Sequence, residues 1–327
     1  MEICVLRGDD VRALLPMSEC IELMRTTMIA VSEGRAEIPL RSLLRMPGDI
    51  GMMGNMSGYL AEPECFGVKL VSMTPRNHGT PYPSHLGVVL LFETGHGQPV
   101  ALLDAAEITA IRTAAASALA TDLLAREDAG DLAILGAGTQ AKSHLEAMLA
   151  VRPIRRVRVW SHRPESAARY AEEQGARFGI EIEPMADVKS TVTGADLICT
   201  TSRAREPVLF SEWVADGAHL NLVGSSVSTD AEVDTALVAR ARYFADFRTS
   251  TINEAGEYLR ALRDGAITPD HILGEIGEVA GNRVAGRVGP EDVTAYKSLG
   301  IAAQDVAAAH FATARARERG FGQRVDI

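Results

Sequence analysis

A short apolar run that leads directly into a glycine-rich turn constrains the fold of this chain more than any other feature. Leu132–Leu135 is followed by Gly136-Ala-Gly-Thr-Gln-Ala141, and the helix-forming segment Lys142–Val151 comes next. In a strand–turn–helix unit, the first glycine permits a tight turn, the second lets the backbone approach a pyrophosphate, and the last small residue allows close helix–strand packing. The first helical turn adds unpaired N–H groups and positive dipole. An ordinary strand-to-helix turn is the alternative. The context favours a dinucleotide site made by Gly136, Gly138, Thr139, Gln140 and Ala141.

Length and composition exclude several classes of protein. The chain has 327 residues, 46% of them hydrophobic, which is enough for two domains with their own cores. Its formal net charge is −10 and no stripe of Lys or Arg is visible, so we expect no nucleic-acid partner. No uninterrupted run of about 18 apolar residues predicts a membrane span. The first ten residues lack the pattern of a secretory signal.

The four cysteines indicate the compartment. Cys4, Cys20, Cys65 and Cys199 lie far apart and form no C-x-x-C pair. We interpret them as buried or free thiols rather than disulfides or zinc ligands. The sequence therefore predicts a cytoplasmic protein without a metal site.

From about residue 130 onward, strand-like runs alternate with helix-like segments. This alternation, with short connections, predicts an α/β fold with a Rossmann-type, doubly wound parallel sheet. Six strand candidates match the count of a full dinucleotide-binding domain. They are Leu132–Leu135, Val157–Trp160, Ile180–Ile182, Leu197–Thr200, His219–Val223 and Tyr243–Ala245. The expected helices are Lys142–Val151, Glu165–Phe178, Asp187–Thr193, Ser211–Val214 and Glu232–Ala241.

The first 105 residues have a different pattern. Glu37–Met46, Gly67–Met73 and Gly87–Glu93 are strand-like and are separated by turns rich in Gly, Pro and Asn. They predict a mixed or antiparallel sheet, flanked by a helix around Ser18–Ser32 with Ser18 as its N-cap.

Two further helices define the expected domains. Ala105–Ala125 has apolar residues at steps of three and four, which predicts a long helix connecting the domains. Lys297–Arg317 is Ala-rich and predicts a C-terminal helix that returns to the first domain. We therefore expect a discontinuous α+β domain, residues 1–120 with 296–327, and a dinucleotide-binding domain, residues 121–295.

The residues that follow the second expected strand bear on the choice of nucleotide. An acidic residue there accepts hydrogen bonds from the ribose 2′-hydroxyl and repels a 2′-phosphate. This chain has Ser161-His162-Arg163 instead, with no carboxylate before Glu165. Ser161 can hydrogen-bond a phosphate, and Arg163 can bind it with a charged fork; the alternative is that Arg163 only covers the surface. The pattern favours NADP(H), with NAD(H) as the alternative.

Three basic residues stand in otherwise apolar surroundings. Lys69 lies inside a strand-like run, Arg112 in an Ala-rich helix, and Arg41 at the start of another strand. A buried ammonium is costly unless it is paired. Taken singly, each is more often a solvated charge than a ligand. No Ser/His/Asp order, H-E-x-x-H motif or paired carboxylates support metal or acyl-transfer chemistry.

These segments together resemble the ornithine cyclodeaminase/mu-crystallin family over nearly the whole chain. The segments that carry the resemblance are Phe66–Lys69, Pro83–His85 with Val89–Glu93, Ile108–Ala115, Gly136–Ala141, Gly194–Asp196, Gly217–His219, Glu275–Glu278 and Lys297–Gly300. The family implies a homodimer of two-domain subunits, in which the discontinuous domain, residues 1–120 with 296–327, binds substrate and forms the dimer. It places the active site in the cleft between the domains. It further implies that Arg41, Lys69 and Arg112 surround a substrate carboxylate. The positions implied to border the cofactor are Ser84, Arg112, Val223, Ser226, Ser298 and Leu299.

Members of the family run different chemistries, so the fold does not settle the reaction. Cyclodeaminases resemble one another in an aspartate two positions after the glycine that matches Gly224, where this chain has Ser226. A hydroxyl cannot take the ring-closing proton at neutral pH. Ketimine reductases that resemble mu-crystallin have serine there. The resemblance therefore implies NADPH-dependent reduction of the C=N bond of a small 2-imino acid, such as 1-pyrroline-2-carboxylate or 1-piperideine-2-carboxylate.

Lys69 and Ser226 are the candidate catalytic residues of this reading. Lys69 would donate a proton, because desolvation lowers an ammonium pKa; the alternative is a substrate iminium that arrives already protonated. Ser226 would orient the imine nitrogen, and the alternative is a hydroxyl that only borders the cofactor. The alternatives, in order, are an open-chain amino-acid dehydrogenase similar to alanine dehydrogenase, an ornithine cyclodeaminase, and an NADPH-dependent ligand-binding protein with little turnover. We expect a small imino or amino acid as the ligand.

Overall fold

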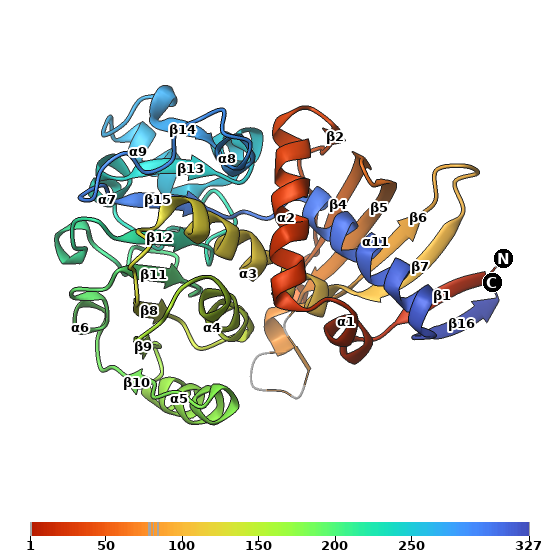
Figure 1. Cartoon of the computed structure of the whole chain (residues 1–327), viewed down its shortest axis with the longest axis horizontal. Coiled ribbons are helices and arrows are strands. Elements are labelled where there is room, and N and C mark those ends of the chain that lie inside the picture. The colour runs from red at the N-terminus through yellow and green to blue at the C-terminus, as the bar shows by residue number, and fades with distance from the viewer. Residues whose placement is uncertain (1, 78–79, 81, 84, 327) are drawn as a thin grey trace. The chain divides into compact units, whose positions relative to one another are not determined.

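The computed structural model describes residues 2–77, 80, 82–83 and 85–326. They form two compact units, and the chain passes twice between them (Figure 1). Unit 1 comprises the residues up to Thr113 together with those from Ile301 onward, and unit 2 comprises Ala114–Gly300, all of which are described. The first crossing lies inside helix α3 (Ala105–Leu124), and the second lies just before helix α11 (Ala302–Arg319).

Unit 2 is built on an eight-stranded sheet in which every strand pair is parallel. The order across the sheet is β10 (Glu183–Pro184), β9 (Arg156–Trp160), β8 (Asp131–Leu135), β11 (Leu197–Thr200), β12 (His219–Leu222), β15 (Thr294–Lys297), β13 (Arg242–Ala245) and β14 (Ile272–Glu275). Because β8 lies between β9 and β11, the chain winds outward in both directions from it. The predicted doubly wound parallel sheet is confirmed.

The helices of unit 2 follow these strands in sequence. They are α4 (Thr139–Val151), α5 (Pro164–Phe178), α6 (Val188–Val192), α7 (Thr235–Arg240), α8 (Arg248–Glu254), α9 (Gly256–Arg263) and α10 (Ile276–Ala280), with short 3₁₀ turns η3 (Ser211–Trp213) and η4 (Pro269–His271). The expected helix over Ser211–Val214 is thus only a 3₁₀ turn.

Three further sequence predictions in this region were wrong. The third strand was expected at Ile180–Ile182, but the structure has it at β10, just after this segment. Ile182 is nevertheless buried. Strands β14 and β15 were missed, because each is four residues long and carries polar or charged residues. Lys297 ends β15 rather than opening the C-terminal helix, which begins at Ala302. Short buried parallel strands lack the alternation that marks a half-exposed strand.

Unit 1 contains the expected mixed sheet, but the strand expected over Glu37–Met46 is divided into two short strands, Ala36–Glu37 and Ser42–Arg45. The order of the sheet is β16 (Gln323–Asp326), β1 (Glu2–Leu6), β7 (Pro99–Asp104), β6 (His85–Phe92), β5 (Glu64–Met73), β4 (Met52–Ala61) and β2 (Ala36–Glu37), with β3 (Ser42–Arg45) also paired to β4. The β1–β7 pair is parallel and the other pairs are antiparallel. The 3₁₀ turns η1 (Gly48–Ile50) and η2 (Pro75–Asn77) complete the described part.

Helices pack against the sheet of unit 1. They are α1 (Gly8–Leu14), α2 (Met17–Ser32) and α11, and α11 contacts α2, β4, β5 and β6 (Figure 1). The approach of α11 is close, since a Cβ on Gly58 would lie 2.9 Å from the Cβ of Ala302. The predicted N-terminal helix exists, but Pro16 occupies the N-cap and Ser18 lies inside the first turn. Proline is well suited to a helix start because its φ is already fixed.

Candidate active site

A buried charge cluster in unit 1 joins two of the predicted basic residues. Lys69 lies on β5 and Arg112 on α3, and each is only 3% exposed. Asp305 of α11, which is completely buried, lies between them. Its Oδ2 is 2.7 Å from Lys69 Nζ, and its Oδ1 accepts a hydrogen bond of 2.8 Å from Arg112 Nε. Both bases are therefore buried and paired, not solvated.

Other side chains surround Lys69 and Arg112. The antiparallel register places Met56 of β4 opposite Lys69, and Lys69 Nζ also donates to Thr109 Oγ1 at 3.4 Å. Arg112 Nη1 donates to Gln304 Oε1 at 2.7 Å. Helix α3 is rich in alanine, and its small side chains leave space for the long Arg112 side chain to extend to α11.

The electrostatics of the cluster depend on burial. Desolvation lowers the pKa of Lys69 to about 8, and the charges of Arg112 and Arg41 act in the same direction, while Asp305 opposes them. Arg41 precedes β3 and is half-buried, and its charge is one of those that lower the pKa of Lys69. Burial disfavours the charged form of Asp305, but Arg112 and Lys69 outweigh it and lower the pKa of that carboxyl. All three predicted anchors thus lie in the same unit, with one carboxylate among them.

The glycine turn of unit 2 has the backbone that a dinucleotide requires. Gly136 has φ +130°, and a Cβ there would lie 2.7 Å from the carbonyl oxygen of Thr201, so only glycine fits. Gly138 is the N-cap of α4, and a Cβ on it would meet nothing within 4 Å. The amides of Thr139–Ala141 form the first turn of α4, where they have no acceptor within the helix. An open backbone surface at the start of a long helix fits a pyrophosphate.

The loop after β9 lies beside this turn. Leu135 of β8 pairs with Trp160 of β9 in a parallel register, and Gly136 N donates to Trp160 O at 2.7 Å. Parallel neighbours end at the same sheet edge, so Ser161–Arg163 emerges next to the glycine turn. Ser161 is half-buried, whereas His162 and Arg163 are exposed.

A buried glutamate that the sequence analysis missed holds the loops after β11 and β12. Glu232 is completely buried, and burial raises its pKa. Its carboxylate accepts hydrogen bonds from Thr200 Oγ1 (2.7 Å), Ser202 N (2.7 Å) and Gly224 N (2.6 Å). The segment Val223–Ser226 is thereby fixed at the edge of the sheet where the glycine turn also lies.

Asp246 fixes the loop after β15 in a similar way. It is completely buried and accepts hydrogen bonds of 2.7 Å from both Leu299 N and Gly300 N. Ser298, the residue before Leu299, is 2% exposed, and its Oγ has no hydrogen-bond partner within the described residues. Buried polar groups normally have a hydrogen-bond partner. The Ser298 hydroxyl, next to the loop that Asp246 holds, therefore fits a hydrogen bond with a polar group of the cofactor.

A second missed feature is a buried ion pair that contacts Ser225, the residue before Ser226. Lys297 Nζ lies 2.8 Å from Glu257 Oε1 and donates to Ser225 O at 2.6 Å, while Ser225 Oγ donates to Glu257 Oε2 at 2.6 Å. Both charged side chains are fully buried. The sequence analysis placed Lys297 in a helix, so it did not predict that this residue ends a buried strand.

The predicted site residues therefore fall into two groups. Unit 1 holds Arg41, Lys69 and Arg112. Ser84 lies outside the described residues. Unit 2 holds Gly136, Gly138, Thr139, Gln140, Ala141, Ser161, His162, Arg163, Val223, Ser226, Ser298 and Leu299.

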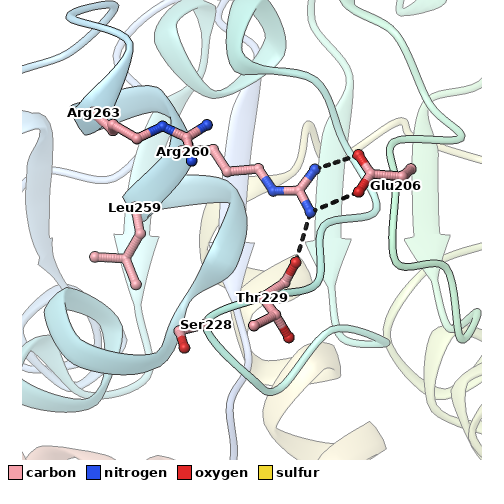
Figure 2. A pocket seen from close by; sticks show the side chains of 6 residues that line it. All are labelled: Glu206, Ser228, Thr229, Leu259, Arg260 and Arg263. Atoms are coloured by element: carbon pink, nitrogen blue, oxygen red, sulfur yellow. Dashed lines mark hydrogen bonds and ion pairs between the residues drawn. The ribbon is translucent and has the colours of Figure 1, made fainter.

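Unit 2 also has an open hollow that the sequence did not indicate. It is about 560 Å³ and is lined by Glu206, Ser228, Thr229, Leu259, Arg260 and Arg263 (Figure 2). Arg260 spans it, donating to Glu206 Oε2 and to Thr229 O at 2.6 Å each. The guanidinium is thus already engaged by its own neighbours.

In the described part of the chain, no group of three or more His, Cys, Asp and Glu is arranged to hold a metal ion. No described helix is long and apolar enough to cross a membrane.

Comparison with known proteins identifies the family. The family model "Ornithine cyclodeaminase/mu-crystallin family" matches residues 1–320. The chain belongs to this family. Among its relatives is the mouse (Mus musculus) ketimine reductase mu-crystallin, which is 37% identical over 278 residues and covers 85% of this chain and 84% of that one.

Solved structures extend this likeness over the full length. The structure of Thermococcus litoralis Delta(1)-pyrroline-2-carboxylate reductase in complex with NADH and L-proline has a TM-score of 0.96 at 33% identity, covering 99% of this chain and 100% of that one. An archaeal alanine dehydrogenase dimer with bound NAD has a TM-score of 0.93 at 28% identity, with 100% of both chains covered. The predicted family and fold class are both confirmed.

Proposed function

We propose that this protein is an NAD(P)H-dependent reductase that converts a small cyclic ketimine, such as 1-pyrroline-2-carboxylate, to the corresponding cyclic amino acid. The observation that carries this proposal is the buried cluster of Lys69, Arg112 and Asp305. Two cations, Lys69 and Arg112, share a single carboxylate, so the cluster retains excess positive charge. A small carboxylic acid is the ligand that such a site takes. A relative of this fold was solved with NADH and L-proline.

The reaction needs a hydride at the imine carbon and a proton at the nitrogen. The reduced nicotinamide supplies the hydride when it is bound. Arg112 and Arg41 hold the substrate carboxylate, and Lys69 holds a proton that it can release, because its pKa of about 8 lies near neutral pH. Ser226 offers a hydroxyl to orient the imine nitrogen.

Residues of unit 2 would hold the cofactor. The amides of Thr139–Ala141 would bind the pyrophosphate, and Ser298 would supply a hydrogen bond from its buried hydroxyl. We further propose a preference for NADPH. Support comes from the loop after β9, where Ser161 and the exposed Arg163 stand beside the glycine turn and no carboxylate occurs before Glu165.

We also propose that the protein is a homodimer. The sheet of unit 1 has an apolar face, on which Phe66 and Phe92 stack with ring centroids 5.2 Å apart. Val68, Leu90 and Leu102 are aligned across three strands of the same sheet and are half-buried in the single chain. Contiguous apolar surface of this kind marks an association site. If this face forms the dimer, Leu90→Lys yields a monomer in sedimentation, and an unchanged dimer contradicts the assignment. The cytoplasmic location remains a prediction of the sequence.

An open-chain amino-acid dehydrogenase is the second candidate, because the fold also matches an archaeal alanine dehydrogenase. The deciding experiment measures NADPH and NADH oxidation by the purified protein with five- and six-membered cyclic ketimines, and with pyruvate plus ammonia. We expect turnover with a ketimine. Faster turnover with pyruvate and ammonia would favour the second candidate, and ammonia release from ornithine with NAD would indicate a cyclodeaminase. Tight NADPH binding without turnover would favour a binding protein.

A further inference from the structure

The two oxygens of Asp305 are divided between two different cations. Oδ2 contacts Lys69 Nζ at 2.7 Å, and Oδ1 contacts Arg112 Nε at 2.8 Å. The carboxylate is completely buried, as are nearly all atoms of both cations. One side chain from α11 therefore links β5 to α3.

We propose that Asp305 is a positioning residue for the reaction: it keeps Lys69 protonated and aimed, and it holds Arg112 beside Lys69 before the substrate binds. This inference rests on the proposed function, since it concerns how the proton donor and the carboxylate anchor are prepared.

The surroundings of Lys69 show why such a residue is needed. On β4 and β6, its paired neighbours Met56 and Val89 are apolar. Cys20 of α2 lies near Arg112, and burial raises the pKa of its thiol to about 12, so it stays neutral. Arg112 from α3 and Arg41 from the segment before β3 both disfavour a charge on Lys69. A buried amine next to two other cations loses its proton near neutral pH unless an anion is close.

The position of Asp305 in its helix keeps it ionised. It lies in the first turn of α11, where the backbone N–H groups and the helix dipole favour a carboxylate. Gln304, the preceding residue, accepts from Arg112 Nη1 at 2.7 Å and donates to Met28 Sδ at 3.4 Å. The start of α11 thus fixes the guanidinium at two points.

The charges balance through the step. With Lys69 protonated, two cations, Lys69 and Arg112, contact Asp305, and the substrate carboxylate adds a second anion. Hydride addition to the imine carbon breaks the C=N π bond, and its electron pair takes the proton from Lys69 Nζ. Lys69 becomes a neutral amine and regains a proton from water, which restores two cations beside the two carboxylates. Asp305 therefore stabilises the donor before the transfer and keeps Arg112 as its cationic partner after it.

The test is the pH dependence of kcat/KM for ketimine reduction. Because activity falls as Lys69 loses its proton, kcat/KM of the wild type decreases at high pH. This decrease is the basic limb of the pH profile. In Asp305→Asn, loss of the negative charge lowers the pKa of Lys69, and we expect the limb to move about one to three pH units toward acid. Gln304→Leu is the matched control, because it removes an uncharged contact to Arg112 from the same helical turn. It is expected to raise KM without moving the limb. The titration of the substrate itself is the same for every variant.

Each result is decisive. A limb that stays in place in Asp305→Asn, or moves equally in Gln304→Leu, overturns the inference, since a merely structural role lowers activity at every pH alike. If the wild type reduces no ketimine, the proposed function fails instead. Folding is checked by circular dichroism and by NADPH binding.

A second variant covers the case in which Asp305→Asn does not fold. Asp305→Glu keeps the negative charge and is expected to leave the limb within about half a pH unit while lowering kcat at least tenfold, because the carboxylate moves by one methylene. A shift toward acid of about one pH unit or more in this variant would also contradict the inference.

Discussion

Arg112 Nε donates to Asp305 Oδ1 at 2.8 Å, across 193 residues of sequence. This contact ties the long helix α3 to the C-terminal helix α11 inside unit 1. It explains how an arginine in an Ala-rich helix is stable when buried, because a charge that is paired and hydrogen-bonded escapes most of the cost of desolvation.

Removal of this arginine should separate substrate handling from cofactor binding. Arg112→Ala is expected to lower kcat/KM for the ketimine by at least about a hundredfold, since it removes a charge-assisted carboxylate contact. NADPH affinity, measured by fluorescence, should stay within a few-fold. Arg12→Ala is the control, because Arg12 is exposed and pairs only with Glu107 in the described residues. Equal activity of the two variants would remove Arg112 from the site.

The two glycines of the turn should respond differently to substitution. Gly136→Ala adds a Cβ 2.7 Å from a backbone oxygen at a φ of +130°, so it should destabilise the protein by about 1–3 kcal/mol. Gly138→Val meets open space, so its melting temperature should change little while NADPH affinity falls at least tenfold. A Gly138→Val protein that binds NADPH normally would show that the pyrophosphate lies elsewhere.

Cofactor preference can be altered at the loop after β9. Ser161→Asp places a carboxylate where a 2′-phosphate would lie, so the ratio of kcat/KM for NADPH to that for NADH should fall at least tenfold. Arg163→Ala should lower the same ratio by a smaller factor, because an exposed arginine is partly screened by solvent. If neither variant changes the ratio, the preference for NADPH does not arise at this loop.

The buried pair of Lys297 and Glu257 should matter for stability. Lys297→Met leaves Glu257 buried without its cation, which should cost about 3–5 kcal/mol in urea unfolding. The double variant Lys297→Met with Glu257→Gln should recover part of this loss, because both charges are then absent. A single variant as stable as the wild type would mean that water or another group reaches Glu257.

Buried His144 predicts a pH dependence of stability. Burial lowers its pKa to about 4, while its ring contacts Gln140 O at 2.7 Å and Ser117 Oγ at 2.9 Å. Since the unfolded state binds the proton at about pH 6.5, the contribution of neutral His144 is complete above that pH and is lost as the pH falls toward 4. Between pH 6 and 5 the wild type should lose about 1 kcal/mol more than His144→Gln. Parallel stability curves would show that His144 is protonated in the folded protein.

Local patterns in the sequence were sufficient for much of this molecule. The alternation of apolar strands and helices after residue 130 identified the parallel sheet, and the Gly136–Ala141 turn identified its nucleotide edge. The three unusual bases Arg41, Lys69 and Arg112 were also visible, because each stands out against its immediate neighbours. Signals of this kind are complete within a few residues, so they need no knowledge of the fold.

The tertiary structure alone decided which groups meet. Asp305 and Glu257 look like ordinary helix-surface charges in the sequence, yet each is buried against a lysine from a distant segment. Lys297 was placed in a helix because its strand is only four residues long and gains its stability from pairing with β12 and β13. Partners that lie far apart along the chain leave no periodic trace, since packing and charge neutralisation bring them together only when the chain folds.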